Sequence, residues 1–163
     1  MFERVLVPLD GSTVGEAAFP VIEQMVDHLA PRTKVEVVLL GVITLSRHWV
    51  VVGEASAPVS YTDEEMDLIR QRVCDYLEKT AANLKQRGVV VRTIVHNGNA
   101  AEEILKTAEE INADLIAMST HGRSGLRKLA FGSITDKVLR GSKVPVLMVR
   151  GEEGITNEQN PGP

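Results

Sequence analysis

Short apolar runs alternate with segments of mixed polarity along the first 150 residues of the chain. Five of these runs are rich in β-branched residues and have the length of strands, at residues 4–9, 34–43, 89–96, 114–119 and 144–149. The run at 34–43 is almost continuously apolar, which is typical of a strand covered on both faces. The pattern therefore predicts five strands, of which the second lies in the interior of a sheet.

The segments between the strands carry apolar residues three and four positions apart, which is the spacing of one face of a helix. They predict four helices, which begin near residues 14, 62, 99 and 133. Three residue pairs have the spacing of a capping box, namely Thr13–Glu16, Thr62–Glu65 and Ser133–Asp136. Asn99 is expected to cap the third helix. Pro20 lies within the first helical pattern, so we expect a kink or a broken first turn there.

Two segments show no regular period. Residues 44–60, which include the only tryptophan, Trp49, are expected to form a long connection, and loops of this length are usually functional or disordered. The polar tail at residues 151–163 is expected to be disordered. These boundaries predict a single domain over residues 1–150.

Strands that alternate with helices predict an α/β fold, in which an open five-stranded parallel sheet carries helices on both faces. Such sheets bind ligands at the carboxyl ends of their strands, where the strand order reverses. With the order 3-2-1-4-5, which is an assumption at this point, the first and fourth strands are neighbours. The turn at Asp10 would then lie beside the loop at residues 119–125, more than 100 residues away in the sequence.

The loop and helix start at residues 118–139 combine glycines with positive charge. Glycine lets backbone approach a phosphate closely and permits positive φ, and a helix N-terminus presents unpaired N–H groups. The residues concerned are Gly122, Gly125, Gly132, Ser133, Arg123, Arg127 and Lys128. Two interpretations remain open, because the same residues also suit ordinary turns, an N-cap and a solvated charged surface.

Composition narrows the choice of function. The net charge of −4 argues against general nucleic-acid binding, which favours basic domains. The single cysteine, Cys74, leaves no intrachain disulfide and favours a reducing compartment. A strand-like apolar run begins within the first ten residues, so we expect no signal peptide before it. No apolar run reaches the roughly 20 residues that are needed to span a bilayer. We therefore expect a cytoplasmic protein that contacts neither nucleic acid nor membrane.

Two stretches, VLVPLDGS near the N-terminus and MSTHGRSGLRKLAFGSITDKVLRGSKVPVLMVR near the C-terminus, resemble the universal stress protein family. The ATP-binding branch of that family carries the motif G-x2-G-x9-G-[ST]. The second glycine, the third glycine and the hydroxyl residue of this motif match Gly122, Gly132 and Ser133. Ser119 stands at the first glycine position, and its hydroxyl is able to donate to a phosphate or ribose oxygen.

The resemblance implies a Rossmann-like fold, a homodimer and a site for ATP, with Mg²⁺ as a possible companion. By the same match, Asp10 would bind the ribose hydroxyls, Pro8 and Leu9 would wall the pocket, and Val42 would hold adenine through its backbone. The residues that would wrap the phosphates are Gly122, Arg123, Ser124, Gly125, Gly132, Ser133, Ile134 and Thr135. Met118, Ser119 and His121 complete the expected cofactor-binding set. His121 is equally suited to a structural hydrogen bond. The fifth strand is expected at a sheet edge and would form the dimer interface.

Three functions remain open on the sequence alone. The first is a stress-response regulator that binds an adenine nucleotide, the second is a slow ATP hydrolase on the same fold, and the third is a dimeric interaction module without nucleotide. Hydrolysis needs a positioned base or a group that orients water. Only His121 and Asp10 are candidates for that role, and the sequence gives neither of them a partner that would make it a base. We therefore assign no catalytic residue.

Overall fold

The computed structural model describes residues 3–12, 15–29, 35–44, 48–52, 55–121 and 132–151. Its centre is a five-stranded sheet made of β1 (Arg4–Leu9), β2 (Glu36–Ile43), β5 (Val90–Asn97), β6 (Leu115–His121) and β7 (Val146–Gly151). The strands lie in the order β5-β2-β1-β6-β7, and every neighbouring pair is parallel. Counted along the chain, these five strands have the order 3-2-1-4-5, so the predicted fold class is confirmed.

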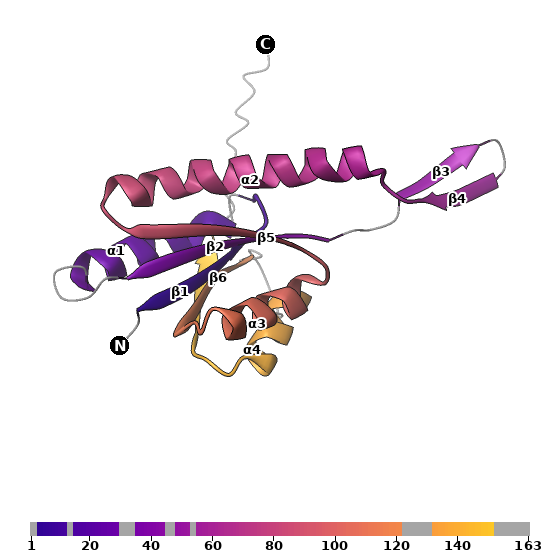
Figure 1. Cartoon of the computed structure of the whole chain (residues 1–163). Coiled ribbons are helices and arrows are strands. Elements are labelled where there is room, and N and C mark those ends of the chain that lie inside the picture. Colours follow the sequence, from indigo (N-terminus) through magenta and orange to yellow (C-terminus); the bar gives the residue numbers. More distant parts are fainter. Residues whose placement is uncertain are drawn as a thin grey trace, which may run out of the picture.

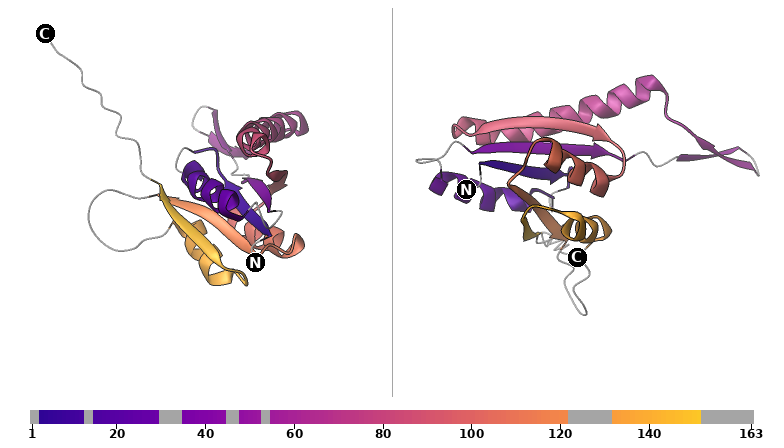
Figure 2. Two further views of the ribbon diagram at one scale, coloured as in Figure 1. Left: turned by 90° about the vertical axis from the view of Figure 1, so that its left-hand side faces the viewer. Right: turned by 60° about the horizontal axis from the view of Figure 1, so that its bottom comes forward.

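Helices cover both faces of this sheet (Figure 1). One layer holds the 3₁₀ segment η1 (Gly15–Ala18), α1 (Phe19–Leu29) and α2 (Asp63–Gln86), and the other holds α3 (Ala100–Glu110) and α4 (Ser133–Gly141). Alternate residues of β1 supply the two cores: Val5 and Val7 pack with the first layer, and Leu6 packs with the second. Figure 2 shows the same arrangement from two further directions, with the strands sandwiched between the two helical layers.

The helix starts follow the predicted caps with one exception. Thr62 and Glu65 form both bonds of the capping box at α2, and the Asn99 side chain accepts backbone N–H bonds at the start of α3. The box predicted at Ser133 and Asp136 is wrong, because Gly132 is the N-cap of α4 and no side chain caps it. Ser133 is already the first helical residue, so its hydroxyl is one position too late to cap. The pair Thr13–Glu16 falls partly outside the described residues.

Pro20 has the effect that the sequence predicted. The segment before it forms the short 3₁₀ turn η1, and α1 begins only at Phe19. Proline is tolerated in the first turn of a helix, because the backbone N–H that it lacks has no intrahelical partner there. The break between η1 and α1 turns the backbone of Gly15 toward the carboxyl end of β6, where it accepts a bond from Ser119.

The expectation of an irregular connection at residues 44–60 is wrong. This segment contains an antiparallel hairpin of β3 (His48–Val52) and β4 (Ala55–Val59), which extends away from the carboxyl end of β2 (Figure 1). Two residues, Gly53 and Glu54, separate the strands in the sequence, and a two-residue connection with glycine first is a known hairpin signal. Pro58 obscured the signal, because proline is tolerated in a strand only at an edge.

β7 ends at Gly151, which is the first residue of the predicted polar tail. The remainder of the predicted tail, residues 152–163, lies outside the described part of the chain. None of the helices in the described ranges combines the length and the apolar character needed to cross a bilayer.

The Asp114 carboxylate ties the start of β6 to the start of β1, and this gives a prediction for acid stability. It accepts hydrogen bonds from the backbone N–H of Arg4 at 2.8 Å and of Glu3 at 2.9 Å. These two bonds lower the pKa of Asp114 below its ordinary value of 3.8. Because the folded pKa is depressed, the carboxylate stabilises the fold above pH 3.8 and this contribution is lost as the pH falls further.

We expect the free energy of unfolding to fall less steeply below about pH 4 for Asp114→Asn than for the parent. Denaturant titrations followed by circular dichroism at several pH values would measure both slopes. Asp75→Asn, on the exposed side of α2, is the matched control and should retain the parental slope. Equal slopes for the parent and Asp114→Asn would contradict the assigned role.

Candidate functional site

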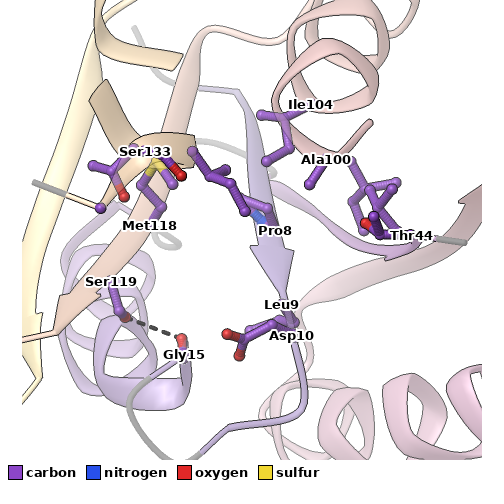
Figure 3. A pocket seen from close by; sticks show the side chains of 15 residues that line it. Pro8, Leu9, Asp10, Gly15, Thr44, Ala100, Ile104, Met118, Ser119 and Ser133 are labelled. Atoms are coloured by element: carbon purple, nitrogen blue, oxygen red, sulfur yellow. Dashed lines mark hydrogen bonds between the residues drawn. The ribbon is translucent and has the colours of Figure 1, made fainter. Parts of the chain in front are cut away.

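A cavity of about 310 Å³ opens at the carboxyl ends of β1 and β6 (Figure 3). These two strands pair only at Val5 with Leu115 and at Leu6 with Ile116, and they separate beyond that point. β1 lies at the switch point of the strand order, because the chain winds outward from it in both directions. Ligand sites of open α/β sheets occur at this position, and small-molecule pockets have volumes of about 300–1,000 Å³.

Ten of the predicted site residues line this cavity. They are Pro8, Leu9, Asp10, Val42, Met118, Ser119, Gly132, Ser133, Ile134 and Thr135. The structure therefore brings together four separate stretches of sequence, and the turn at Asp10 lies beside Ser119 as the predicted topology required. His121 is the last residue of β6, and its side chain lies outside the described part of the structure. The predicted residues Gly122, Arg123, Ser124 and Gly125 lie outside the described part of the chain.

Five further residues line the cavity and were missed by the sequence analysis. They are Gly15, Leu40, Thr44, Ala100 and Ile104. Ile104 belongs to the apolar face of α3 and looked like an ordinary core residue, while Thr44 directly follows the end of β2. Position at the carboxyl end of a predicted strand was the available signal for Thr44. Nothing in the sequence pattern marks Gly15 or Ala100.

Asp10 occupies the first turn after β1, and its two carboxylate oxygens differ in their surroundings. Oδ1 accepts from the backbone N–H of Ser12 at 2.9 Å and from the Ser12 hydroxyl at 2.6 Å. Ser12 Oγ in turn accepts from the N–H of Gly15 at 2.9 Å. Among the described residues, none donates to Oδ2. The turn thus fixes one oxygen of an exposed carboxylate and leaves the other for a ligand.

Gly15 is required by close approach. A Cβ built on this residue would lie 2.5 Å from Oδ1 of Asp10, a separation that no real side chain tolerates. An alanine here would push either the carboxylate or η1 out of place. The absence of a side chain at Gly15 therefore leaves room for the Asp10 carboxylate in its present orientation.

The Ser119 hydroxyl is fully engaged with the backbone of η1 (Figure 3). It donates its only proton to the carbonyl of Gly15 at 3.0 Å and accepts from the N–H of Ala18 at 2.9 Å. A hydroxyl has one proton, so donation to a phosphate or ribose oxygen would break the bond to Gly15. In this structure the serine at the motif's first glycine position acts on the protein rather than facing a ligand.

The start of α4 forms the opposite wall. The backbone N–H groups of Ser133, Ile134 and Thr135 precede the first intrahelical bond, which runs from the N–H of Asp136 to the carbonyl of Gly132. Such N–H groups and the positive end of the helix dipole favour an anion. Gly132 has φ of −54°, so its glycine is not needed for a left-handed conformation. Apart from its chain neighbours, no atom of the described residues lies within 4 Å of a Cβ placed at Gly132.

The third part of the cavity is apolar and lies between β2 and α3. Leu40 and Ile104 are buried there, with Val42 and Ala100 beside them. The pairing of β1 with β2 ends at Leu9 and Gly41. Backbone groups of successive strand residues point to opposite sides, and the carbonyl of Ile43 faces β5, where it accepts from Gly98. The carbonyl of Val42 therefore faces the cavity side, beyond the end of β1.

One ionisable pair braces the edge of the site. The Tyr76 hydroxyl of α2 donates to Oε1 of Glu16 in η1 at 3.0 Å. Burial, together with this carboxylate, raises the pKa of Tyr76 well above its ordinary value, so the phenol stays protonated and remains a donor at neutral pH. The described residues contain no group of three or more His, Cys, Asp or Glu side chains that could hold a metal ion.

Comparison with known proteins gives consistent results. A family model described as the universal stress protein family matches residues 1–150. Universal stress protein YxiE of Bacillus subtilis is 32% identical over 155 residues, which cover 92% of this chain and 100% of YxiE. Universal stress protein MJ0577 of Methanocaldococcus jannaschii is 28% identical over 159 residues, covering 92% of this chain and 96% of its own.

Solved structures agree with the fold. The structure of MJ0577 superposes with a TM-score of 0.67 at 26% identity, covering 94% of this chain and 99% of that chain. The Arabidopsis thaliana protein At3g01520, a universal stress protein family member solved with AMP bound, has a TM-score of 0.62 at 16% identity and covers 96% of both chains. At this identity the second likeness concerns the fold alone.

Proposed function

Because the chain belongs to the universal stress protein family, we propose that it is a stress-response regulator that binds an adenine nucleotide, ATP, in the cavity between β1 and β6. One observation carries the proposal: the walls of this cavity offer three different chemistries. The helix N-terminus suits the phosphates of a nucleotide. The carboxylate with one unbonded oxygen suits the sugar, and the apolar slot suits the base.

The phosphates are assigned to the start of α4. Its free N–H groups and helix dipole attract anions, and the open space beside Gly132 lets a phosphate approach the backbone. The sequence that follows β6 contains Arg123, Arg127 and Lys128, whose positive charge would also favour phosphate binding. Any Mg²⁺ that accompanies the nucleotide would be held mainly by phosphate oxygens and water, because Asp10 is the only carboxylate among the lining residues.

The sugar is assigned to Asp10. Its Oδ2 is left to accept from ribose hydroxyls, while Oδ1 is held by Ser12. The base is assigned to the slot between Leu40, Val42, Ala100 and Ile104, where the carbonyl of Val42 would accept from an exocyclic amino group. Adenine carries such a group. The AMP bound to At3g01520 supports the proposal, since it shows that this fold accommodates an adenine nucleotide.

The direct test is mass spectrometry of small molecules released from the denatured protein, followed by calorimetric titration of nucleotide-free protein. We expect ATP or one of its hydrolysis products to be released, and ATP to bind more tightly than GTP, which lacks the exocyclic amino group at the same ring position. A protein that releases no nucleotide and gives no binding heat with millimolar ATP would refute the proposal. Steady release of ADP from added ATP would instead favour a hydrolase.

We also propose a homodimer formed through β7. Among the described strands, β7 pairs only with β6, which places it at the edge of the sheet, and an exposed edge strand needs a partner or a cover. Two copies that pair across a two-fold axis would satisfy both edges. The family membership supports this arrangement.

Met148→Lys is expected to shift the mass measured by light scattering from dimer toward monomer at micromolar concentration. Met148 lies in β7 but belongs to neither core cluster, so the substitution should disturb the edge more than the fold. Val90→Lys is the matched control, since Val90 is 55% exposed on β5 at the opposite edge of the sheet. A parent that is monomeric in this measurement would contradict the dimer.

A further inference from the structure

The bonds of Ser119 connect the end of β6 to Asp10 through a continuous chain of contacts. Ser119 binds both the carbonyl of Gly15 and the N–H of Ala18. Gly15 donates to Ser12 Oγ, and Ser12 donates twice to Oδ1 of Asp10. Gly15 also touches the Asp10 carboxylate directly, since no Cβ fits between them. The orientation of Asp10 therefore depends on where Ser119 holds η1.

The contacts on the other side of η1 show that this segment remains anchored without Ser119. Glu16 accepts from Tyr76 of α2, and Ala18 is fully buried against the core beneath it. Loss of the Ser119 hydroxyl would leave the Gly15 carbonyl and the Ala18 N–H without this partner. Unpaired polar groups of this kind draw water or shift toward a new partner. We expect η1 to move rather than unfold, and Asp10 to lose its fixed orientation.

We propose that Ser119 is a positioning residue that sets a preference for ribonucleotides over deoxyribonucleotides, by holding η1 and so aiming Oδ2 of Asp10 at the sugar. The inference rests on the proposed nucleotide function. It also gives a role to the departure from the family motif at this position. The Ser119 side chain points at η1 and not across the cavity, so the serine braces one wall without filling the phosphate space (Figure 3).

The test compares the affinities of ATP and 2′-deoxy-ATP for the parent, Ser119→Ala, Ser119→Thr and Ser142→Ala. The parent should prefer ATP by roughly tenfold, the ratio that about 1.4 kcal/mol produces. Ser119→Ala should reduce this ratio to about twofold, mostly through weaker ATP binding. Ser119→Thr keeps a hydroxyl on Cβ and should restore most of the preference.

Ser142→Ala is the matched control. Ser142 Oγ also makes one donated and one accepted backbone bond, both to Val144, but at the opposite end of the sheet, before β7. Loss of the Ser142 hydroxyl should reduce stability to a similar extent and leave the ratio of the affinities for ATP and 2′-deoxy-ATP unchanged. Amide exchange in the nucleotide-free protein gives an independent readout: the Ala18 N–H should exchange faster in Ser119→Ala and at the parental rate in Ser142→Ala.

The outcomes separate this inference from the function on which it rests. A parent that binds neither nucleotide would overturn both. A parent that prefers ATP, with the same ratio in Ser119→Ala, would overturn the positioning role alone. Equal losses for ATP and 2′-deoxy-ATP in Ser119→Ala would also overturn it, since they would mean that the hydroxyl contacts the phosphates or base. An unchanged ratio combined with faster Ala18 exchange would reduce Ser119 to a stabilising contact.

Discussion

Gly132→Val is expected to weaken ATP binding by about 30-fold or more while leaving the protein folded. The valine side chain would project into open space beside the N-terminus of α4, where the proposed phosphates approach the backbone. Steric overlap of this kind typically costs about 1–3 kcal/mol, and about 2 kcal/mol corresponds to the stated change. Calorimetric titration with ATP would measure it.

The fold should tolerate this substitution, because φ of −54° at Gly132 suits any residue and the added Cβ meets no atom of the described residues beyond its chain neighbours. Valine is a poorer N-cap than glycine, so a loss of up to about 1 kcal/mol in stability is expected. Lys137→Val introduces the same side chain at an exposed position of α4 and should change the affinity by less than about threefold. Parental affinity in a folded Gly132→Val would place the phosphates elsewhere.

Asp10→Ala is expected to weaken ATP binding by roughly 10- to 100-fold. Hydrogen bonds to charged groups contribute about 1.5–3 kcal/mol, and this range corresponds to the stated change. The variant should lose much less affinity for 2′-deoxy-ATP, because the deoxy sugar already lacks one of the two hydroxyls. Calorimetric titrations with ATP and with 2′-deoxy-ATP would give the loss of affinity for each nucleotide.

Asp10→Asn serves as the control for the local turn. Its side-chain oxygen can still accept from Ser12, so the turn and η1 should keep their positions. An amide NH2 group then stands in the place of Oδ2, and it can donate to a ribose oxygen but cannot accept from the ribose hydroxyls. We expect an affinity for ATP between those of the parent and Asp10→Ala. Equal losses for ATP and 2′-deoxy-ATP in Asp10→Ala would show that this carboxylate acts on the turn and not on the sugar.

Local patterns predicted the elements well where the signals agreed. The capping box at Thr62 and Glu65, the cap at Asn99 and the break at Pro20 all occur, because each depends only on groups within one turn of helix. The hairpin at β3 and β4 was missed, since Pro58 weighed against a strand and short apolar runs have no distinctive period. The box at Ser133 was wrong because α4 begins one residue earlier than the spacing indicates, with Gly132 as its N-cap.

The sequence by itself determined the α/β class and the positions of the five strands of the main sheet, because periodicity is a property of local order along the chain. The resemblance to a family motif, and not periodicity, supplied most of the ten predicted residues that line the cavity. Only the tertiary structure decided how those residues act. The divergence of β1 and β6, the close approach of Gly15 to Asp10 and the engagement of the Ser119 hydroxyl all join residues from separate elements. Ser119 and Gly15 are 104 positions apart, and a contact at that separation is fixed by packing and not by local pattern. For this reason the sequence predicted a ligand contact for Ser119, whereas in the structure its hydroxyl binds the backbone of η1.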